Sequence, residues 1–321
     1  RTLTMPNYNG VWSLSTQYQN ATDWPKVLPA AMGIFAGGQR ADDGTQLNVI
    51  EFFDIATTGN TTDFGDTTAA RRNGVGAGSS TRGLIIAGRG DSTFKSIDFI
   101  SMASKGNAQD FGDITTATFN LAACSNGTRA VTGGGFTSDD INVMEYVTIA
   151  SAGDATDFGD LLATSQTQGL ASPTRGVFGG GYNNGGYNNV IQYVTIANTG
   201  NASDFGDLSV VRYQTGTAAS SVRGIFAGGR TNSLHDVMDY ITIASTGNAS
   251  DFGNLLAAAK GVGGVSSNIR AVFAGGDTGS YQNVMQYVTI ASTGNASDFG
   301  DLTGTNAFGG GTCSRNHGGL Q

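Results

Sequence analysis

The chain has 321 residues, of which 50 are Gly and 4 are Pro. This glycine content is about twice the average of globular proteins, but the scarcity of Pro and the lack of a Gly-X-Y period exclude collagen. Apolar residues make up 39% of the sequence, which excludes global disorder, and no apolar run is long enough for a membrane-spanning helix. The formal net charge of −8 makes nucleic acid and anionic lipid poor partners, because both are negatively charged.

The residue types that usually build metal and disulfide centres are scarce. The cysteines are Cys124 and Cys313, and the histidines are His235 and His317. A disulfide scaffold or a Cys-based zinc site needs more cysteines, so we expect two buried thiols. We predict no metal site and no cofactor. Because the chain starts at Arg1 rather than Met, we also expect it to be a processed or excised product.

One unit recurs along the chain with a period of 47 residues. The triplet Asp-Phe-Gly has its Phe at Phe64, Phe111, Phe158, Phe205, Phe252 and Phe299. A second aromatic lies twelve residues before each of them, at Phe52, Phe99, Tyr146, Tyr193, Tyr240 and Tyr287. Trp12 and Trp24 are also twelve apart, which we interpret as a seventh, degenerate copy. A fixed period of this length indicates a solenoid, a propeller or an array.

The fourth unit illustrates the elements expected in each copy. In chain order these are a short apolar strand, a variable segment, a strand rich in β-branched residues, a turn, a short strand and a strand of small residues: Arg175–Gly181, Tyr182–Asn188, Asn189–Ala197, Asn198–Ser203, Asp204–Leu208 and the region around Gly216–Ser221. No window has a sustained helical period. Four antiparallel strands in a radial repeat form a propeller blade.

These patterns predict an all-β protein, a seven-bladed β-propeller with four antiparallel strands per blade. Small-residue segments such as Gly74–Gly78 are expected next to the axis, where bulk would clash, and the paired aromatics between blades. We expect N-terminal outer strands in residues 1–31 and C-terminal inner strands in residues 302–321 to complete the closing blade. Such closure would remove the open sheet edge and make residues 1–321 one domain.

The order of the motifs in each unit resembles the kelch repeat. Gly180-Gly181, Tyr193 and Phe205 correspond to the diglycine, tyrosine and tryptophan of that family, with Phe in place of Trp. The Asp-Phe-Gly-Asp segment and Arg-Gly-Val-Phe-Gly-Gly-Gly are more specifically similar to kelch-like repeats in virion structural proteins of tailed cyanophages. The resemblance covers nearly the whole chain. It implies a virion or extracellular location and a tail or adhesin component.

The segments between the second and third strands of each unit differ from copy to copy, whereas the turn before Asp-Phe-Gly is nearly constant. A scaffold that keeps one face constant and varies the other is typical of a recognition surface, although drift of unconstrained loops is the alternative. Tyr182 and Tyr187 suit sugar rings or polar protein surfaces. The candidate ligand-binding residues are Arg40, Asp42, Asp43, Phe94, Lys95, Asp139, Asp140, Tyr182, Tyr187, Asn188, Arg230, His235 and Tyr281.

Other recurring residues favour structural roles. An arginine opens the second strand of five units, and we expect it to pair with a nearby Asp of the repeat: Arg82, Arg129, Arg175, Arg223 and Arg270. Repeated Asp pairs such as Asp157 and Asp160 lack the dense alternation of a calcium loop. No nucleophile–histidine or paired-carboxylate arrangement stands out, so we predict no catalytic residues.

The leading hypothesis is therefore a non-enzymatic binding or structural module. The resemblance implies a phage virion component that recognises a host surface glycan or another virion protein. A propeller-type carbohydrate-active enzyme and an intracellular kelch-type adaptor for protein interaction remain as alternatives. The first would need a pocket with titratable groups, and the second an oligomerisation domain, which nothing in this chain resembles.

Overall fold

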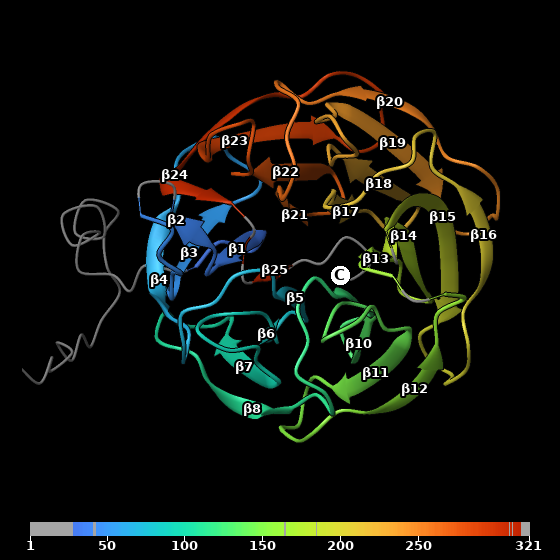
Figure 1. The fold of residues 1–321 in the computed structure, drawn as a ribbon. Helices are drawn as coiled ribbons and strands as arrows, with labels where there is room; N and C mark the ends of the chain where they lie inside the picture. Colours follow the sequence, from blue (N-terminus) through green and yellow to red (C-terminus); the bar gives the residue numbers. More distant parts are fainter. Residues whose placement is uncertain are drawn as a thin grey trace, which may run out of the picture.

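The computed structural model describes residues 28–40, 43–163, 165–183, 185–307, 309 and 311–315. These residues contain 25 strands, which form six sheets arranged radially around one axis (Figure 1). Each sheet is a blade of four consecutively hydrogen-bonded antiparallel strands, called a to d from the axis outward. The described part of the chain is thus an all-β propeller built from repeated four-stranded blades, as the 47-residue period predicts.

Blades 2 to 6 follow the chain, each from strand a to strand d. Their strands are β5 (Val75–Gly78), β6 (Arg82–Ile86), β7 (Ser96–Ser101) and β8 (Gln109–Asp113); β9 (Ala122–Ser125), β10 (Arg129–Gly133), β11 (Val143–Thr148) and β12 (Thr156–Asp160); β13 (Gln168–Ala171), β14 (Arg175–Asn183), β15 (Gly186–Thr195) and β16 (Ser203–Asp207); β17 (Gly216–Ala219), β18 (Arg223–Ala227), β19 (Val237–Thr242) and β20 (Ser250–Asn254); β21 (Gly263–Ser266), β22 (Arg270–Ala274), β23 (Gln282–Thr289) and β24 (Ser297–Ala307).

Blade 1 joins the two ends of the described chain. Its strand a is β25 (Gly311–Ser314), and its other strands are β1 (Met32–Ala36), β3 (Val49–Asp54) and β4 (Thr62–Asp66). Strand β25 pairs with β1 from Gly33–Ser314 to Ala36–Gly311. A short strand, β2 (Gln39–Arg40), adds to the outer strand β24 of blade 6. The ring therefore closes through one inner strand supplied from the C-terminal side.

The expectation of seven blades is wrong, because the described residues form six. The C-terminal inner strand β25 completes the blade that begins at β1, within the first Asp-Phe-Gly unit, and not a separate seventh blade. Six units of 47 residues thus give six blades. The Trp12–Trp24 half-unit, on which the seventh blade rested, lies outside the described residues.

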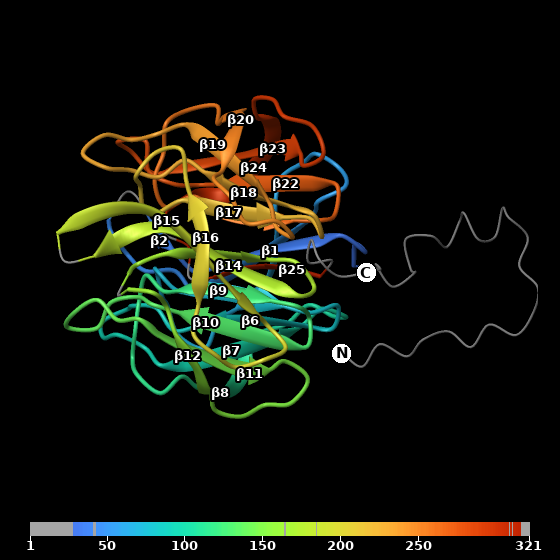
Figure 2. The same ribbon diagram turned by 90° about the vertical axis from the view of Figure 1, so that its right-hand side faces the viewer.

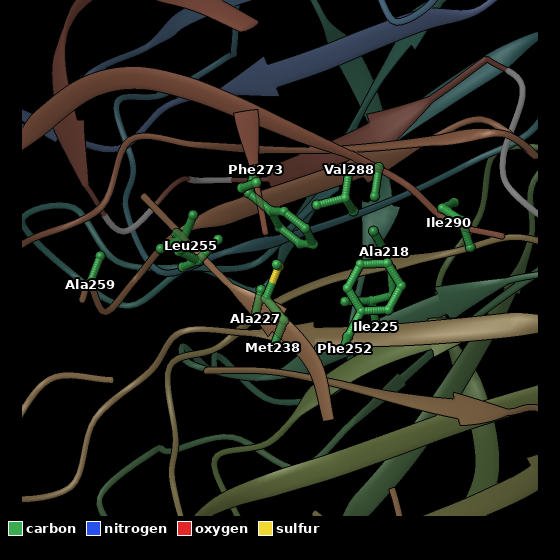
Figure 3. Close-up of a cluster of buried hydrophobic side chains, with 13 residues drawn as sticks. Ala218, Ile225, Ala227, Met238, Phe252, Leu255, Ala259, Phe273, Val288 and Ile290 are labelled. Carbon is green, nitrogen blue, oxygen red and sulfur yellow. The ribbon is translucent and has the colours of Figure 1, made fainter. Parts of the chain in front are cut away.

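Six apolar clusters hold the ring together, one at each junction between neighbouring blades. Figure 3 shows the cluster between blades 5 and 6, where Met238 and Phe252 lie close to Phe273. The cluster between blades 6 and 1 packs Phe53 against Phe299, with ring centroids 5.2 Å apart. The same kind of packing across all six junctions confirms that the aromatic pairs belong to the contacts between blades.

Glycines allow the inner strands to approach one another at the axis. A Cβ on Gly76 would lie 2.3 Å from the carbonyl oxygen of Thr312 in the neighbouring inner strand. A Cβ on Gly169 would lie 2.5 Å from the carbonyl oxygen of Ala123. Side chains larger than hydrogen would therefore push the blades apart, which confirms the steric reason for small residues at the axis.

The Asp-Phe-Gly triplet forms hydrogen bonds with the c–d turn of the next blade. In blade 3, the Phe158 carbonyl accepts from the Gly200 N–H at 2.7 Å, and Asn201 Oδ1 accepts from the Asp160 N–H at 3.0 Å. Gly159 sits between them at φ 137°, at a position where its Cβ would lie 2.6 Å from the Gly200 backbone. The same contacts recur at the closing junction, where the Gly59 N–H donates to the Phe299 carbonyl at 2.8 Å.

The recurring arginines have a structural role, but not the predicted one. Arg129 Nη1 donates to the carbonyls of Ile196 and Ala197 in the next blade, at 2.9 and 3.0 Å. Its guanidinium also lies 4.2 Å from the ring centroid of Tyr146. Carbonyls and an aromatic face, rather than an Asp, thus stabilise these cations, and each arginine links one blade to the next.

Candidate functional site

The connections between strands b and c, and those between strand d and the next strand a, lie on one end of the propeller. We call this end the variable face. Its most prominent feature is the β14–β15 hairpin, which projects past the body of the ring at the left of Figure 2. The other end carries the a–b turns and the nearly constant c–d turns.

The β14–β15 hairpin shows that the variable segment of the fourth unit is ordered strand rather than loop. Strand β14 continues to Asn183 and β15 begins at Gly186, so Tyr182 lies directly opposite Tyr187. Their ring centroids are 5.4 Å apart. At the base of the hairpin, Asn188 Nδ2 donates to Ser165 Oγ at 3.4 Å. The hairpin therefore presents two tyrosines from a regular backbone.

A third tyrosine completes the cluster, and sequence analysis did not single it out. Tyr213 comes from the connection between blades 4 and 5, and its ring centroid lies 5.4 Å from that of Tyr182 and 5.7 Å from that of Tyr187. Tyr213 is 9% exposed, whereas Tyr182 and Tyr187 are half-buried. We call Tyr182, Tyr187 and Tyr213 the tyrosine cluster.

Arg230 binds the buried member of the tyrosine cluster. Its Nε donates to the Tyr213 hydroxyl oxygen at 2.9 Å, Nη2 donates to the same oxygen, and its guanidinium lies 5.1 Å from the Tyr213 ring centroid. Nearby in the same connection, His235 Nε2 lies 3.1 Å from Thr231 Oγ1. Burial lowers the pKa of His235; Arg212 lowers it further and Asp236 opposes the shift. Five predicted residues, Tyr182, Tyr187, Asn188, Arg230 and His235, belong to blades 4 and 5.

The tyrosine cluster belongs to a ring of side-chain pairs with one backbone geometry and varied chemistry. In four blades, the residue three before strand a forms an isolated antiparallel bridge with the residue three after strand b, and the pairs are Arg72–Arg89, Phe119–Phe136, Tyr213–Arg230 and Lys260–Asp277. In blade 4 the Gln166 N–H donates to the Tyr182 carbonyl at 3.0 Å. The backbone geometry of these connections is thus repeated, whereas the paired side chains differ. They are two cations in one blade, two phenyl rings in another, and a cation with an anion in a third.

Predicted residues from blades 6 and 1 lie elsewhere on the variable face. The Tyr281 hydroxyl donates to Gln39 Oε1 at 3.1 Å, and Arg72 Nη1 donates to the same oxygen at 2.9 Å. Arg40 and Asp43 are exposed, and Asp42 lies outside the described residues. The Thr45 N–H donates to Asp43 Oδ1 at 2.9 Å and lowers the pKa of that carboxyl group.

Predicted residues of blades 2 and 3 are held by local contacts. The Phe94 ring centroid lies 5.2 Å from the guanidinium of Arg71. Lys95 Nζ forms an exposed ion pair with Asp113 at 2.9 Å, which raises the pKa of Lys95. Asp139 is exposed, whereas Asp140 is 7% exposed and accepts from Gln166 Nε2 at 2.9 Å. These groups are spread around the face, and Asp140 is connected to the tyrosine cluster through Gln166, whose backbone N–H donates to the Tyr182 carbonyl.

A chain of amides borders the channel on the variable face. Asn73 Nδ2 donates to Asn120 Oδ1 at 2.7 Å, and Asn120 Nδ2 donates to Gln166 Oε1 at 2.7 Å. Gln166 in turn donates to Asp140, so the chain crosses three blades. It fixes polar groups at the rim, where a ligand on this face would meet them.

The channel itself is lined by the inner strands and has a cavity volume of about 130 Å³. Its described lining is mainly Gly, Ala, Val, Leu, Ser, Thr, Asn and Gln, and its ionisable side chains are Cys124 and Cys313. Burial raises the pKa of both thiols to about 12, which keeps them neutral. The cysteines are buried and free, as expected.

No group of three or more His, Cys, Asp or Glu side chains in the described part of the chain has an arrangement that could hold a metal ion. The described residues also hold no helix with the length and hydropathy that a membrane crossing requires.

Comparison with known proteins found no relative: no protein-family model matches the chain, and no curated protein is similar enough to match.

Proposed function

We propose that this chain is a non-enzymatic binding module whose variable face recognises a carbohydrate on a host cell surface. The propeller fold is one that commonly serves binding or interaction. The similarity of the repeats to kelch-like virion proteins of cyanophages suggests the setting, a tail or adhesin component of a phage particle. Several copies on one particle would raise the avidity of weak contacts.

The observation that carries the proposal is the tyrosine cluster beside the ring of varied pairs. Sugar rings present apolar C–H faces and hydroxyl groups, and tyrosine offers a flat apolar ring together with a hydroxyl. Tyr182 and Tyr187 remain partly exposed, and Tyr213, which is bound by Arg230, packs against both rings. A ligand would therefore meet aromatic surface already ordered by packing, which reduces the entropy cost of binding.

In four blades the connections on the variable face have the same backbone bridges. This constancy favours a binding surface over loops that vary without constraint. Drifting loops would be free to change length and backbone, whereas the bridges at Arg72–Arg89, Phe119–Phe136 and Lys260–Asp277 keep the same geometry. Only the side chains vary between them, which is the pattern of a surface adapted to an asymmetric ligand.

The experiment is a glycan array followed by titration of the best ligand, with the wild type and Tyr187→Ala. We expect the variant to lose at least about tenfold in affinity, since burying a large apolar side chain is worth about 1.5–3 kcal/mol. Val222→Ala, at an exposed a–b turn on the opposite end, is the control and should bind like the wild type.

The mixtures of protein and glycan from the titration are also assayed for the release of reducing sugar ends. Release of sugar products by the wild type would contradict the non-enzymatic assignment. Binding that Tyr187→Ala and Val222→Ala reduce equally would contradict the assignment to the variable face. Wild-type binding to a virion protein, with no glycan bound, would replace the carbohydrate by a protein ligand.

A further inference from the structure

One position between the blades is occupied by different charges in different copies. On strand c the six equivalent residues are Glu51, Asp98, Glu145, Gln192, Asp239 and Gln286, at steps of 47. The residues 27 positions earlier, counted around the closed ring, are Asn306, Arg71, Thr118, Ser165, Arg212 and Ala259 in the corresponding order. The copies thus form an internal series of substitutions at one buried site.

Two copies contain a buried ion pair. Arg71 Nη2 lies 2.9 Å from Asp98 Oδ2, and Arg212 Nη2 lies 2.9 Å from Asp239 Oδ2. Both arginine side chains are 0% exposed. Desolvation lowers the pKa of Arg71 and Arg212, and the facing carboxylates oppose the shift. In these blades the chain supplies its own guanidinium to neutralise the carboxylate.

Two other copies are neutral. Gln192 Oε1 accepts from the Leu162 N–H at 2.7 Å, and Gln286 Oε1 accepts from the Leu256 N–H at 2.7 Å. The residues at the position of Arg71 and Arg212 in these copies, Ser165 and Ala259, are small. An amide therefore makes the same backbone hydrogen bond that a carboxylate makes elsewhere, without requiring a cation.

Blades 1 and 3 have a glutamate at this position without the arginine, at Glu51 and Glu145, and the cavity described below lies beside Glu145. Glu145 is 6% exposed, and its Oε1 and Oε2 accept from the Thr115 N–H at 3.1 and 3.3 Å. Thr118 stands where Arg71 and Arg212 stand in their blades. Within the described residues, no ion pair joins Glu145 to a cationic side chain. A buried carboxylate without a counter-charge is unfavourable by several kcal/mol, as an order of magnitude.

A cavity lies beside the Glu145 carboxylate. Its volume is about 120 Å³, and five threonines contribute to its lining, namely Thr115, Thr116, Thr118, Thr132 and Thr137. Ile114, Ile141 and Val143 provide apolar wall, and Val143 is 40% exposed. The cavity therefore combines a buried negative charge, hydroxyl oxygens and apolar surface next to the position that a guanidinium fills in blades 2 and 5.

We propose that this cavity binds a guanidinium group supplied from outside the chain. Glu145 pairs with the group as Asp98 pairs with Arg71, and the threonine hydroxyls accept its remaining N–H donors. The source is either a small guanidino compound or an arginine side chain of a protein partner, since both present the same planar cation. The site is separate from the tyrosine cluster and does not depend on the carbohydrate proposal.

The test measures thermal stability and calorimetric binding with guanidinium chloride at low millimolar concentration, against equal NaCl and tetramethylammonium chloride. A Gly-Arg-Gly peptide forms the second arm. We expect guanidinium to raise the melting temperature of the wild type relative to both reference salts. Glu145→Gln should weaken binding at least about tenfold, because a charge-assisted hydrogen bond is lost. This variant should fold, since Gln192 and Gln286 occupy the same position in other blades.

Thr118→Arg provides an independent variant. It places a guanidinium on the chain as in blade 2, so it should stabilise the protein and abolish the response to added guanidinium. Binding of guanidinium but not of the peptide would identify a small compound as the source, and binding of both would allow a protein arginine. Equal responses of wild type, Glu145→Gln and Thr118→Arg, or equal responses to guanidinium and sodium, would overturn the proposal.

Discussion

At the scale of single residues, the glycine of Asp-Phe-Gly determines how closely two blades meet. Gly159 adopts a positive φ of 137°, and a Cβ there would lie 2.6 Å from the backbone of Gly200 in the next blade. Both the conformation and the close approach exclude other residues. The triplet thus recurs six times because every junction, including the closing one, is built in the same way.

Gly159→Ala is therefore expected to destabilise the protein by at least about 1–3 kcal/mol, since the new methyl clashes with backbone that cannot rotate away. Urea denaturation measures the change. Gly294→Ala is the matched control, because a Cβ at Gly294 would have nothing within 4 Å. Equal stability of the two variants would show that the approach between blades is not tight.

The buried thiols predict a specific response to alkaline pH. The pKa of Cys124 and Cys313 is raised from 9.0 to about 12 by burial. Above pH 9 the unfolded chain loses the thiol protons while the folded chain keeps them, so stability falls as the pH rises toward 12, by about 1.4 kcal/mol per pH unit for each thiol.

Melting temperatures between pH 8 and pH 10.5 test this response. The wild type is expected to lose stability more steeply than Cys124→Ala/Cys313→Ala, in which both titrating groups are absent. The difference between the slopes isolates the thiols from the lysines and tyrosines that titrate in the same range. Parallel slopes would mean that the thiols are not buried as neutral groups.

At the scale of elements, the arginine that opens strand b links each of blades 2 to 6 to the c–d turn of the next blade. Blade 1 has Met32 at the start of its strand b, which makes Arg129→Met a substitution that the chain itself tolerates in another copy. The variant loses two hydrogen bonds to carbonyls and a cation–π contact with Tyr146.

We expect Arg129→Met to lower the free energy of unfolding by about 1–2 kcal/mol. Chemical denaturation provides the measurement. Arg89→Met is the control: Arg89 is exposed on the variable face and lies 5.3 Å from the Phe119 ring, so its loss should matter less. A larger effect at Arg89 than at Arg129 would contradict the linking role.

Sequence periodicity predicted the elements well because each unit repeats the same local chemistry. The small-residue inner strands, the paired aromatics and the β-branched third strand lie where the 47-residue pattern places them. The arginine partners were missed, because the interacting groups are main-chain carbonyls, which have no sequence signature. The β14–β15 hairpin replaces a predicted variable loop, and the sequence does not indicate it because its tyrosines and asparagines lack the apolar alternation of a strand.

The candidate site was only partly predictable. The variable b–c segments indicate Tyr182, Tyr187 and Arg230 as candidate binding residues. Tyr213 lies in a d–a connection, outside those segments. The signal was present: residues 72, 119, 166, 213 and 260 are Arg, Phe, Gln, Tyr and Lys at steps of 47. The exchange of Arg71 for Thr118 could have been found in the same alignment.

At the scale of the whole molecule, the repeats alone do not show which blade the last inner strand completes. The inner strand β25 is similar to other inner strands, and only its pairing with β1 shows which blade it completes. The apolar cluster between blades 6 and 1 and the Gly59–Phe299 hydrogen bond then make the closing junction equivalent to the others.

Removing residues 309–321 deletes β25 and should open the ring. Blade 1 would lose its inner strand, its neighbours would lose the packing of Cys313, and β1 would become a free sheet edge that favours association. We expect a loss of more than about 3 kcal/mol in stability.

Thermal unfolding and size-exclusion chromatography measure this effect. Removal of residues 316–321 alone leaves β25 in place and is the control. An unchanged melting temperature after the longer truncation would contradict closure by the C-terminal strand.

Hydrogen–deuterium exchange with and without the carbohydrate ligand tests most directly whether the variable face is the binding surface. Protection is expected in the β14–β15 hairpin and in the connection from Tyr213 to Arg230, with unchanged exchange in the c–d turns at the opposite end. Protection concentrated in those turns, for example around Asn201 and Asn248, would contradict the proposed function.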